Sequence, residues 1–230
     1  MRKQPSLKMR ALRRMCLTLF GLAAMLFLSA GSLRFWQASV FLVLQAAFWT
    51  YFFLDFLKND PQLLERRLKS KETEPEQKLF QRLFALILNS AVILAGLDFR
   101  FGWTRRWVGD VPVAVVIAGQ TMAVAGYWLV FWVMKTNTFA SSIIQVENQR
   151  TVIRSGPYEV VRHPMYTGMV VTVIGIPLAL GSYVTLPVFA LLVPLLAYRL
   201  IHEERMLRRD LSGYAEYCEH TRFRLVPRVW

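Results

Sequence analysis

The sequence predicts an all-α integral membrane protein of about six membrane helices, the last two forming a helical hairpin, with a C-terminal amphipathic helix after them. Hydrophobic residues make up 55% of the 230 positions and charged residues only 19%. The apolar residues are also gathered into long runs without charge. About 20 apolar residues, at 1.5 Å rise each, cross a hydrocarbon core of ~30 Å. These observations together predict a bundle of membrane helices.

Four runs contain no charged residue: residues 15–33, 35–54, 111–134 and 165–198. A weaker run over residues 83–97 lies between Arg82 and Asp98 and extends to Phe80 and Phe99. The first run, at 19 residues, exceeds the ~7–15 apolar residues of a secretory signal, so we expect an uncleaved first membrane helix. Residues 1–134 are therefore expected to hold four membrane spans.

The run over residues 165–198 is too long for one span. Its 34 residues would make a helix of ~51 Å, well beyond the ~30 Å core. We expect it to fold back at Gly181-Ser182 into two arms. With that hairpin, 23 Lys and Arg residues lie in segments on one side of the membrane and 4 on the other. This asymmetry is the positive-inside pattern, which places both termini in the cytoplasm. The membrane would be the inner membrane in a bacterium and the endoplasmic reticulum in a eukaryote.

The net charge of +13 does not indicate a nucleic-acid partner, because the basic residues lie in short clusters beside the apolar runs. The expected partner is the lipid bilayer. Cys16 and Cys218 are the only cysteines, so we expect no metal site. Residues 202–220 are polar with scattered apolar positions, which predicts an amphipathic helix on the cytoplasmic surface.

The hairpin brings ionisable residues together. His163 enters the first arm, whereas Arg199, Glu203 and Glu204 leave the second, so antiparallel arms place them at one depth. Ionisable groups that converge at a membrane boundary are candidates for a functional site. Arg199 and Glu203 are one helical turn apart and can face the same way. The alternative is that these side chains extend to water or pair with lipid head groups.

The segment before the hairpin contains a tight turn. Gly156-Pro157 is a turn signal, and Pro164 suits the first turn of a helix. Tyr158, His163 and Tyr166 are thus expected around a helix N-terminus, which favours anionic groups. A simple helix-entry turn with interfacial aromatic residues is the alternative.

These residues form an ordered set of motifs. Gly156-Pro157-Tyr158, the run Arg-His-Pro-Met-Tyr-Thr-Gly over 162–168, Glu203-Glu204, and Gly213-Tyr214 with Tyr217 follow one another along the chain. This set resembles the isoprenylcysteine carboxyl methyltransferase family, which is related to phospholipid N-methyltransferases. The resemblance covers roughly residues 135–228, so residues 135–230 are expected to be the cofactor-binding region and the helices before them to provide substrate access.

The resemblance implies an S-adenosylmethionine-dependent methyltransferase with a cytoplasm-facing site. The acceptor would be amphiphilic: a prenylated cysteine carboxylate, a phospholipid amine, or a small thiol or other lipophilic molecule. Arg199 would contact the substrate and is able to clamp a carboxylate. Glu204 is the candidate proton acceptor for an amine nucleophile. The residues expected at the cofactor are Gln145, Arg150, Thr151, Val152, Ile153, Tyr158, His163, Pro164, Met165, Tyr166 and Glu203.

Two other classes stay open. Membrane sterol reductases resemble the same family in their C-terminal region and use NADPH, but they usually have more membrane helices. A non-catalytic membrane protein would leave the ordered motifs to coincidence. Binding of S-adenosylmethionine or of NADPH separates the two enzyme classes.

Overall fold

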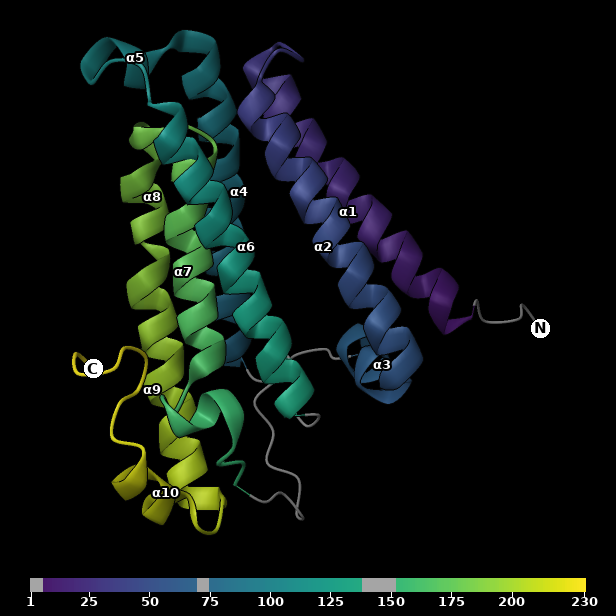
Figure 1. The fold of residues 1–230 in the computed structure, drawn as a ribbon, viewed down its shortest axis with the longest axis vertical. Helices are drawn as coiled ribbons and strands as arrows, with labels where there is room; N and C mark the ends of the chain where they lie inside the picture. Colours follow the sequence, from purple (N-terminus) through teal and green to yellow (C-terminus); the bar gives the residue numbers. More distant parts are fainter. Residues whose placement is uncertain (1–5, 70–74, 138–151) are drawn as a thin grey trace.

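The computed structural model describes residues 6–69, 75–137 and 152–230, and no strand occurs in these ranges (Figure 1). This confirms the all-α prediction. The helices are α1 Leu7–Ala30, α2 Trp36–Asn59, α3 Pro61–Lys69, α4 Pro75–Phe101, α5 Trp103–Trp107, α6 Val113–Thr136, η1 Gly156–Glu159, α7 Pro164–Ala179, η2 Tyr183–Thr185, α8 Leu186–Ala190, α9 Leu192–Asp210 and α10 Tyr214–His220.

Five described helices are long and apolar enough to cross a membrane. They are α1, α2, α4 from Gln77 onward, α6, and the continuous stretch Tyr183–Asp210 formed by η2, α8 and α9. The apolar helix α7 has 16 residues and is shorter than these. The protein is therefore a multi-pass membrane protein, and the expected number of six spans depends on α7 and stays a prediction.

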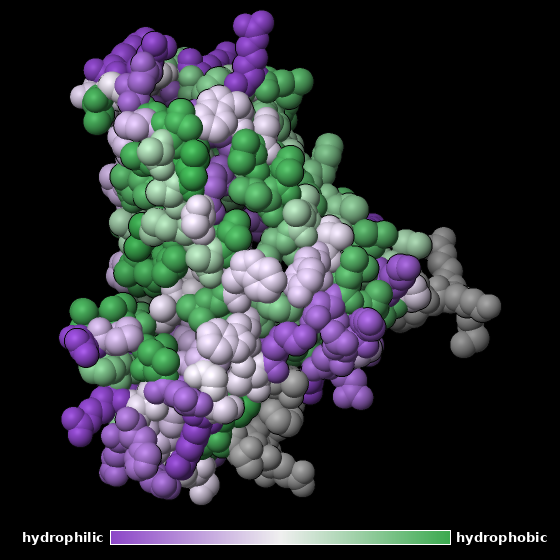
Figure 2. All heavy atoms as spheres, in the orientation of Figure 1, coloured by the Kyte–Doolittle hydropathy of each residue, from purple (hydrophilic) through white to green (hydrophobic). Residues whose placement is uncertain are grey.

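The long helices run between two ends of the molecule (Figure 1). The start of α1, the short helix α3, the end of α9 and α10 lie at one end, which we call the basic end. The α1–α2 turn, α5 and the α7–α8 turn lie at the other. Figure 2 shows hydrophobic side chains gathered between two hydrophilic ends. This distribution is the one expected of helices surrounded by lipid.

The expected hairpin is present. Gly181 has a φ of 65°, in the left-handed region, and its amide donates to the Leu178 carbonyl at 3.0 Å. The turn is fixed to α4 by Asp98, whose carboxylate accepts hydrogen bonds from the Thr104 amide and hydroxyl and from the Ser182 hydroxyl. All three side chains are buried. The turn therefore lies where the apolar run predicts it, and α7 and α9 return toward the basic end.

Close packing between α6 and α7 positions the start of α7. A Cβ atom on Gly126 would lie 2.5 Å from the Gly168 carbonyl oxygen and 2.2 Å from Thr172 Oγ1. A Cβ atom on Gly175 would lie 2.7 Å from the Ala123 backbone nitrogen. Small residues at membrane-helix interfaces let backbones approach in this way.

The predicted amphipathic helix over residues 202–220 is divided in two. Residues up to Asp210 continue α9, and only Tyr214–His220 form the separate short helix α10. Gly213 has a φ of 79°, which suits the break. Glu204 is buried whereas Arg205 and residues 208–210 are exposed, so the end of α9 has one side in the interior of the basic end and one side at its surface.

Candidate active site at the basic end

Tyr166 joins the two arms of the hairpin at the basic end. Its hydroxyl donates to Glu203 Oε2 at 2.6 Å and accepts from Arg199 Nε at 3.2 Å. Tyr166 and Arg199 are buried, whereas Glu203 is half-buried. The Arg199 guanidinium also lies over the Phe80 ring of α4, at 4.6 Å from the ring centroid. The predicted convergence of Arg199 and Glu203 with the start of α7 is therefore present.

Tyr158 lies beside this network. Its hydroxyl accepts a hydrogen bond from Asn137 Nδ2 at 3.0 Å, and its carbonyl accepts from the Tyr217 hydroxyl at 2.7 Å. Burial is the largest effect on the Tyr158 phenol and raises its pKa; the Glu203 carboxylate also raises it, and Arg67 of α3 acts the other way. Tyr158 is thus within electrostatic reach of both Glu203 and the N-terminal half of the chain.

His163 caps α7 and is 5% exposed. Its Nε2 atom lies 3.3 Å from the Tyr214 hydroxyl oxygen. Burial lowers the pKa of the imidazole, and the nearby carboxylates of Glu203 and Glu204 only partly oppose this. His163 is therefore neutral near pH 7, and in that state it can act toward a ligand as a hydrogen-bond donor rather than as a cation.

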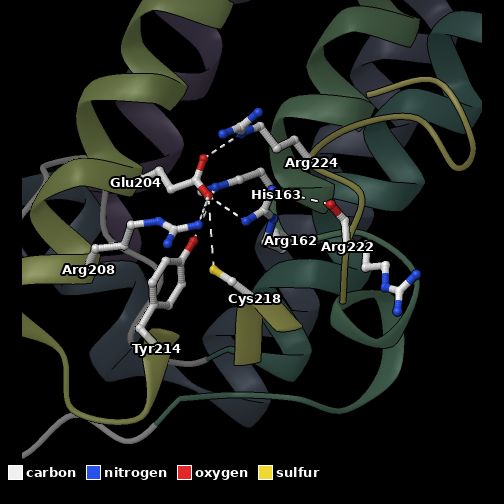
Figure 3. Close-up of polar contacts among 8 residues, drawn as sticks. All are labelled: Arg162, His163, Glu204, Arg208, Tyr214, Cys218, Arg222 and Arg224. Atoms are coloured by element: carbon white, nitrogen blue, oxygen red, sulfur yellow. Dashed lines mark hydrogen bonds and ion pairs between the residues drawn. The ribbon is translucent and has the colours of Figure 1, made fainter. Parts of the chain in front are cut away.

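Glu204 forms a second cluster with arginines (Figure 3). Its carboxylate pairs with Arg162 Nη1 at 2.6 Å, Arg224 Nε at 2.6 Å and Arg208 Nη2 at 3.3 Å. The side chain is almost fully buried. Because three guanidinium groups favour its charged form, Glu204 is a weak base, and this geometry argues against its predicted role as proton acceptor.

The backbone amides before α7 are engaged by the C-terminal segment. The Arg162 amide donates to the Phe223 carbonyl at 2.9 Å, and the His163 amide donates to the Arg224 carbonyl at 3.0 Å. The amides of Tyr166 and Thr167 donate to the His163 carbonyl. These four donors are thus used within the protein, which leaves fewer backbone N–H groups for the anion site expected at this helix N-terminus.

The remaining predicted residues are placed as follows. Pro164 is buried at the first position of α7, and Met165 packs against the cluster that includes Phe56, Leu63 and Phe131. Val152 and Ile153 are half-buried in the segment before η1. Gln145, Arg150 and Thr151 lie outside the described residues.

Several contacts of the site were not predicted. Arg162 belongs to the motif over 162–168, but nothing in its spacing from Arg224 indicates that the two arginines share one carboxylate. Asn137 donates a hydrogen bond to Tyr158, and Arg67 interacts with it electrostatically. No motif in the sequence indicates either interaction, because each joins separate segments of the chain.

Comparison with known proteins gives a match over the hairpin region. Residues 114–212 match the phospholipid methyltransferase family. This segment contains α6, η1, α7, α8 and α9, and so includes Tyr158, His163, Tyr166, Arg199 and Glu203. The match indicates a membrane methyltransferase. It agrees with the relationship to phospholipid N-methyltransferases that the motifs imply.

Two curated proteins are also similar. A cobalt-zinc-cadmium resistance protein, CzcN, of Cupriavidus metallidurans is 26% identical over 131 residues, 56% of each chain. A nickel-cobalt-cadmium resistance protein, NccN, of Alcaligenes xylosoxydans xylosoxydans is 23% identical over 136 residues, 59% of each chain. The similarity thus covers less than two thirds of these relatives. Within its described ranges, this chain has no group of three or more His, Cys, Asp or Glu side chains that could hold a metal ion.

Proposed function

We propose that this protein is an S-adenosylmethionine-dependent membrane methyltransferase whose active site contains Tyr158, His163, Tyr166, Arg199 and Glu203. The observation that carries the proposal is the buried Tyr166 hydroxyl, which links Glu203 to Arg199 at the start of the hairpin. The family match over residues 114–212 supports the methyltransferase class over the NADPH-dependent reductase and the non-catalytic protein. The cofactor is the one that the family resemblance implies.

The donor set suits that cofactor, which carries an amine, a carboxylate, ribose hydroxyls and a sulfonium. Glu203 is only half-buried, so its carboxylate can accept hydrogen bonds from the amine or the ribose. Neutral His163 can donate one N–H to the carboxylate. Tyr166 holds Glu203 in place, as a packed and hydrogen-bonded partner does for a binding group.

The chemical step needs positioning more than acid–base groups. The cofactor supplies a methyl group to the acceptor nucleophile, and the sulfonium leaves as a neutral thioether. The protein's contribution is to hold the two reactants in line and to exclude water. Arg199, buried beside Glu203, is the group proposed to orient the acceptor.

The acceptor is proposed to be an amphiphile that approaches from the bilayer. The site lies at the basic end, which we propose to be cytoplasmic, as the positive-inside pattern predicts. A lipid amine is the first acceptor to test because the matched family is that of phospholipid methyltransferases. A prenylated cysteine carboxylate and small lipophilic molecules are next. The proton of an amine acceptor would leave to water, since Glu204 is held by arginines.

The deciding experiment is calorimetric titration of the detergent-purified protein with S-adenosylmethionine. We expect micromolar binding that Glu203→Gln abolishes and that Glu219→Gln, an exposed control, leaves unchanged. Binding of NADPH in place of S-adenosylmethionine by folded protein would contradict the proposal. Transfer of a labelled methyl group to fractionated lipids then identifies the acceptor.

A further inference from the structure

The segment over residues 221–226, which we call the strap, crosses the turn that carries His163. We infer that the strap belongs to the active site and holds His163 and Glu203 in register, with Arg224 and Glu204 as positioning residues. This inference rests on the proposed function and adds residues that the family match over 114–212 does not contain.

The strap binds the start of α7 through backbone and side-chain hydrogen bonds. The amides of Arg162 and His163 donate to the carbonyls of Phe223 and Arg224 at 2.9 and 3.0 Å. One turn later, the Thr167 hydroxyl donates to the Leu225 carbonyl at 2.8 Å. These bonds bracket His163 on both sides, so the position of its ring depends on the strap.

The apolar side of the strap faces the same site. Leu225 is buried in a cluster with Tyr166, Leu196 and Leu200. Tyr166 is the residue whose hydroxyl binds Glu203. A shift of the strap would therefore displace Tyr166 through packing and His163 through hydrogen bonds.

Glu204 provides the charged part of the arrangement (Figure 3). Its carboxylate receives Arg224 from the strap and Arg162 from the turn, each at 2.6 Å. One buried carboxylate on α9 thus ties together the strap and the residue before His163. A buried charge of this kind is stable only while its partners are in place, so loss of one partner should disturb the others.

The two adjacent glutamates therefore have different tasks. Glu203 faces Tyr166 and the proposed cofactor site, whereas Glu204 faces the arginines. Because the two residues are neighbours on one helix, fixing the Glu204 side chain also fixes the rotation of α9 that presents Glu203. The strap acts on both halves of the site through this single carboxylate.

The first test compares two arginines of the strap region. Arg224→Ala removes the ion pair with Glu204. Arg222→Ala removes an equal charge from an exposed residue and keeps the backbone carbonyl that accepts from Arg162. Loss of a hydrogen bond to a charged group predicts S-adenosylmethionine binding that is about tenfold weaker or more in Arg224→Ala. Arg222→Ala should bind within about twofold of wild type. Equal affinities of the two variants and the wild type would overturn the inference.

A double-mutant cycle tests whether Arg224 acts through Glu204. Glu204→Gln and Arg224→Gln should each weaken S-adenosylmethionine binding. The affinity of the double variant should be no lower than that of whichever single variant binds less tightly. Strictly additive losses would show that Arg224 acts on another group. Arg224→Lys, which keeps the charge, should recover part of the affinity.

Hydrogen exchange without cofactor separates this inference from the proposed function. In Arg224→Ala, the amides of Arg162 and His163 should exchange faster than in wild type or Arg222→Ala. Thr167→Val keeps the side-chain shape and loses the hydroxyl's bond to Leu225 together with its longer bond, at 3.4 Å, to the His163 carbonyl. It should show the same change if Arg224→Ala does not fold. Unchanged exchange would reject the strap even if the protein binds S-adenosylmethionine. Faster exchange in a protein that binds no S-adenosylmethionine would retain the strap and reject the proposed function.

Discussion

Replacing Tyr166 with phenylalanine tests the polar network that joins the two arms of the hairpin. The change removes one hydroxyl, which donates to Glu203 at 2.6 Å and accepts from Arg199 at 3.2 Å. A hydrogen bond to a charged group contributes about 1.5–3 kcal/mol. Glu203 is half-buried and can recover a bond from water, whereas Arg199 is buried, so we expect a net loss equal to about one such bond.

That loss should appear in cofactor binding and turnover. A change of about 1.5–3 kcal/mol corresponds to roughly 10–100-fold in Kd for S-adenosylmethionine or in kcat/KM. Calorimetry and methyl-transfer kinetics on the same preparation measure both. Tyr198→Phe, at a position that is 59% exposed, is the matched control. Refutation would be a Tyr166→Phe variant whose Kd and kcat/KM both stay within about threefold of wild type.

Two further predictions concern helix packing and pH. Gly126→Ala should lower the melting temperature, because its Cβ would lie 2.5 Å from a backbone oxygen of α7 and overpacking costs about 1–3 kcal/mol. Gly21→Ala is the control, because its Cβ would have nothing within 4 Å. Equal melting temperatures of the two variants would contradict the packing argument. His163 has a lowered pKa, so the unfolded chain binds more protons below its ordinary pKa of about 6.5 and stability falls as the pH decreases through that value. Thermal melts at pH 7.5 and about 5.5 should show a smaller decrease for His163→Gln than for wild type or the exposed control His220→Gln, and identical decreases in all three would contradict the assignment.

The membrane helices were predictable because the thickness of a bilayer sets their length. The 34-residue apolar run had to turn back, and Gly181-Ser182 is the one place in it where a left-handed glycine ends α7. Hydropathy does not fix the ends of helices in polar regions. For that reason the stretch 202–220 was expected as one helix, although it contains the end of α9 and a separate α10.

The site was predictable only as far as its motifs reach. Tyr158, His163, Tyr166, Arg199 and Glu203 were named from their order in the chain, and the structure brings them to one end of the hairpin. Which of two adjacent glutamates faces them depends on the rotation of α9 against α7. That rotation is set by packing between helices and has no local sequence signal.

We propose that the two glutamates have different effects on the charge of the proposed site. Arg162, Arg208 and Arg224 would together place three positive charges beside a cofactor whose reacting group is itself a cation. Glu204 binds all three guanidinium groups and so reduces their field at the neighbouring site. Glu203 is then left with one hydroxyl donor, and its carboxylate stays within electrostatic reach of Tyr158 and His163. A carboxylate on the inner side of the site, with a second carboxylate offsetting part of the arginine charge behind it, suits the sulfonium of the proposed cofactor. Replacing Glu204 alone should therefore weaken binding of that cation without removing any group proposed to touch it.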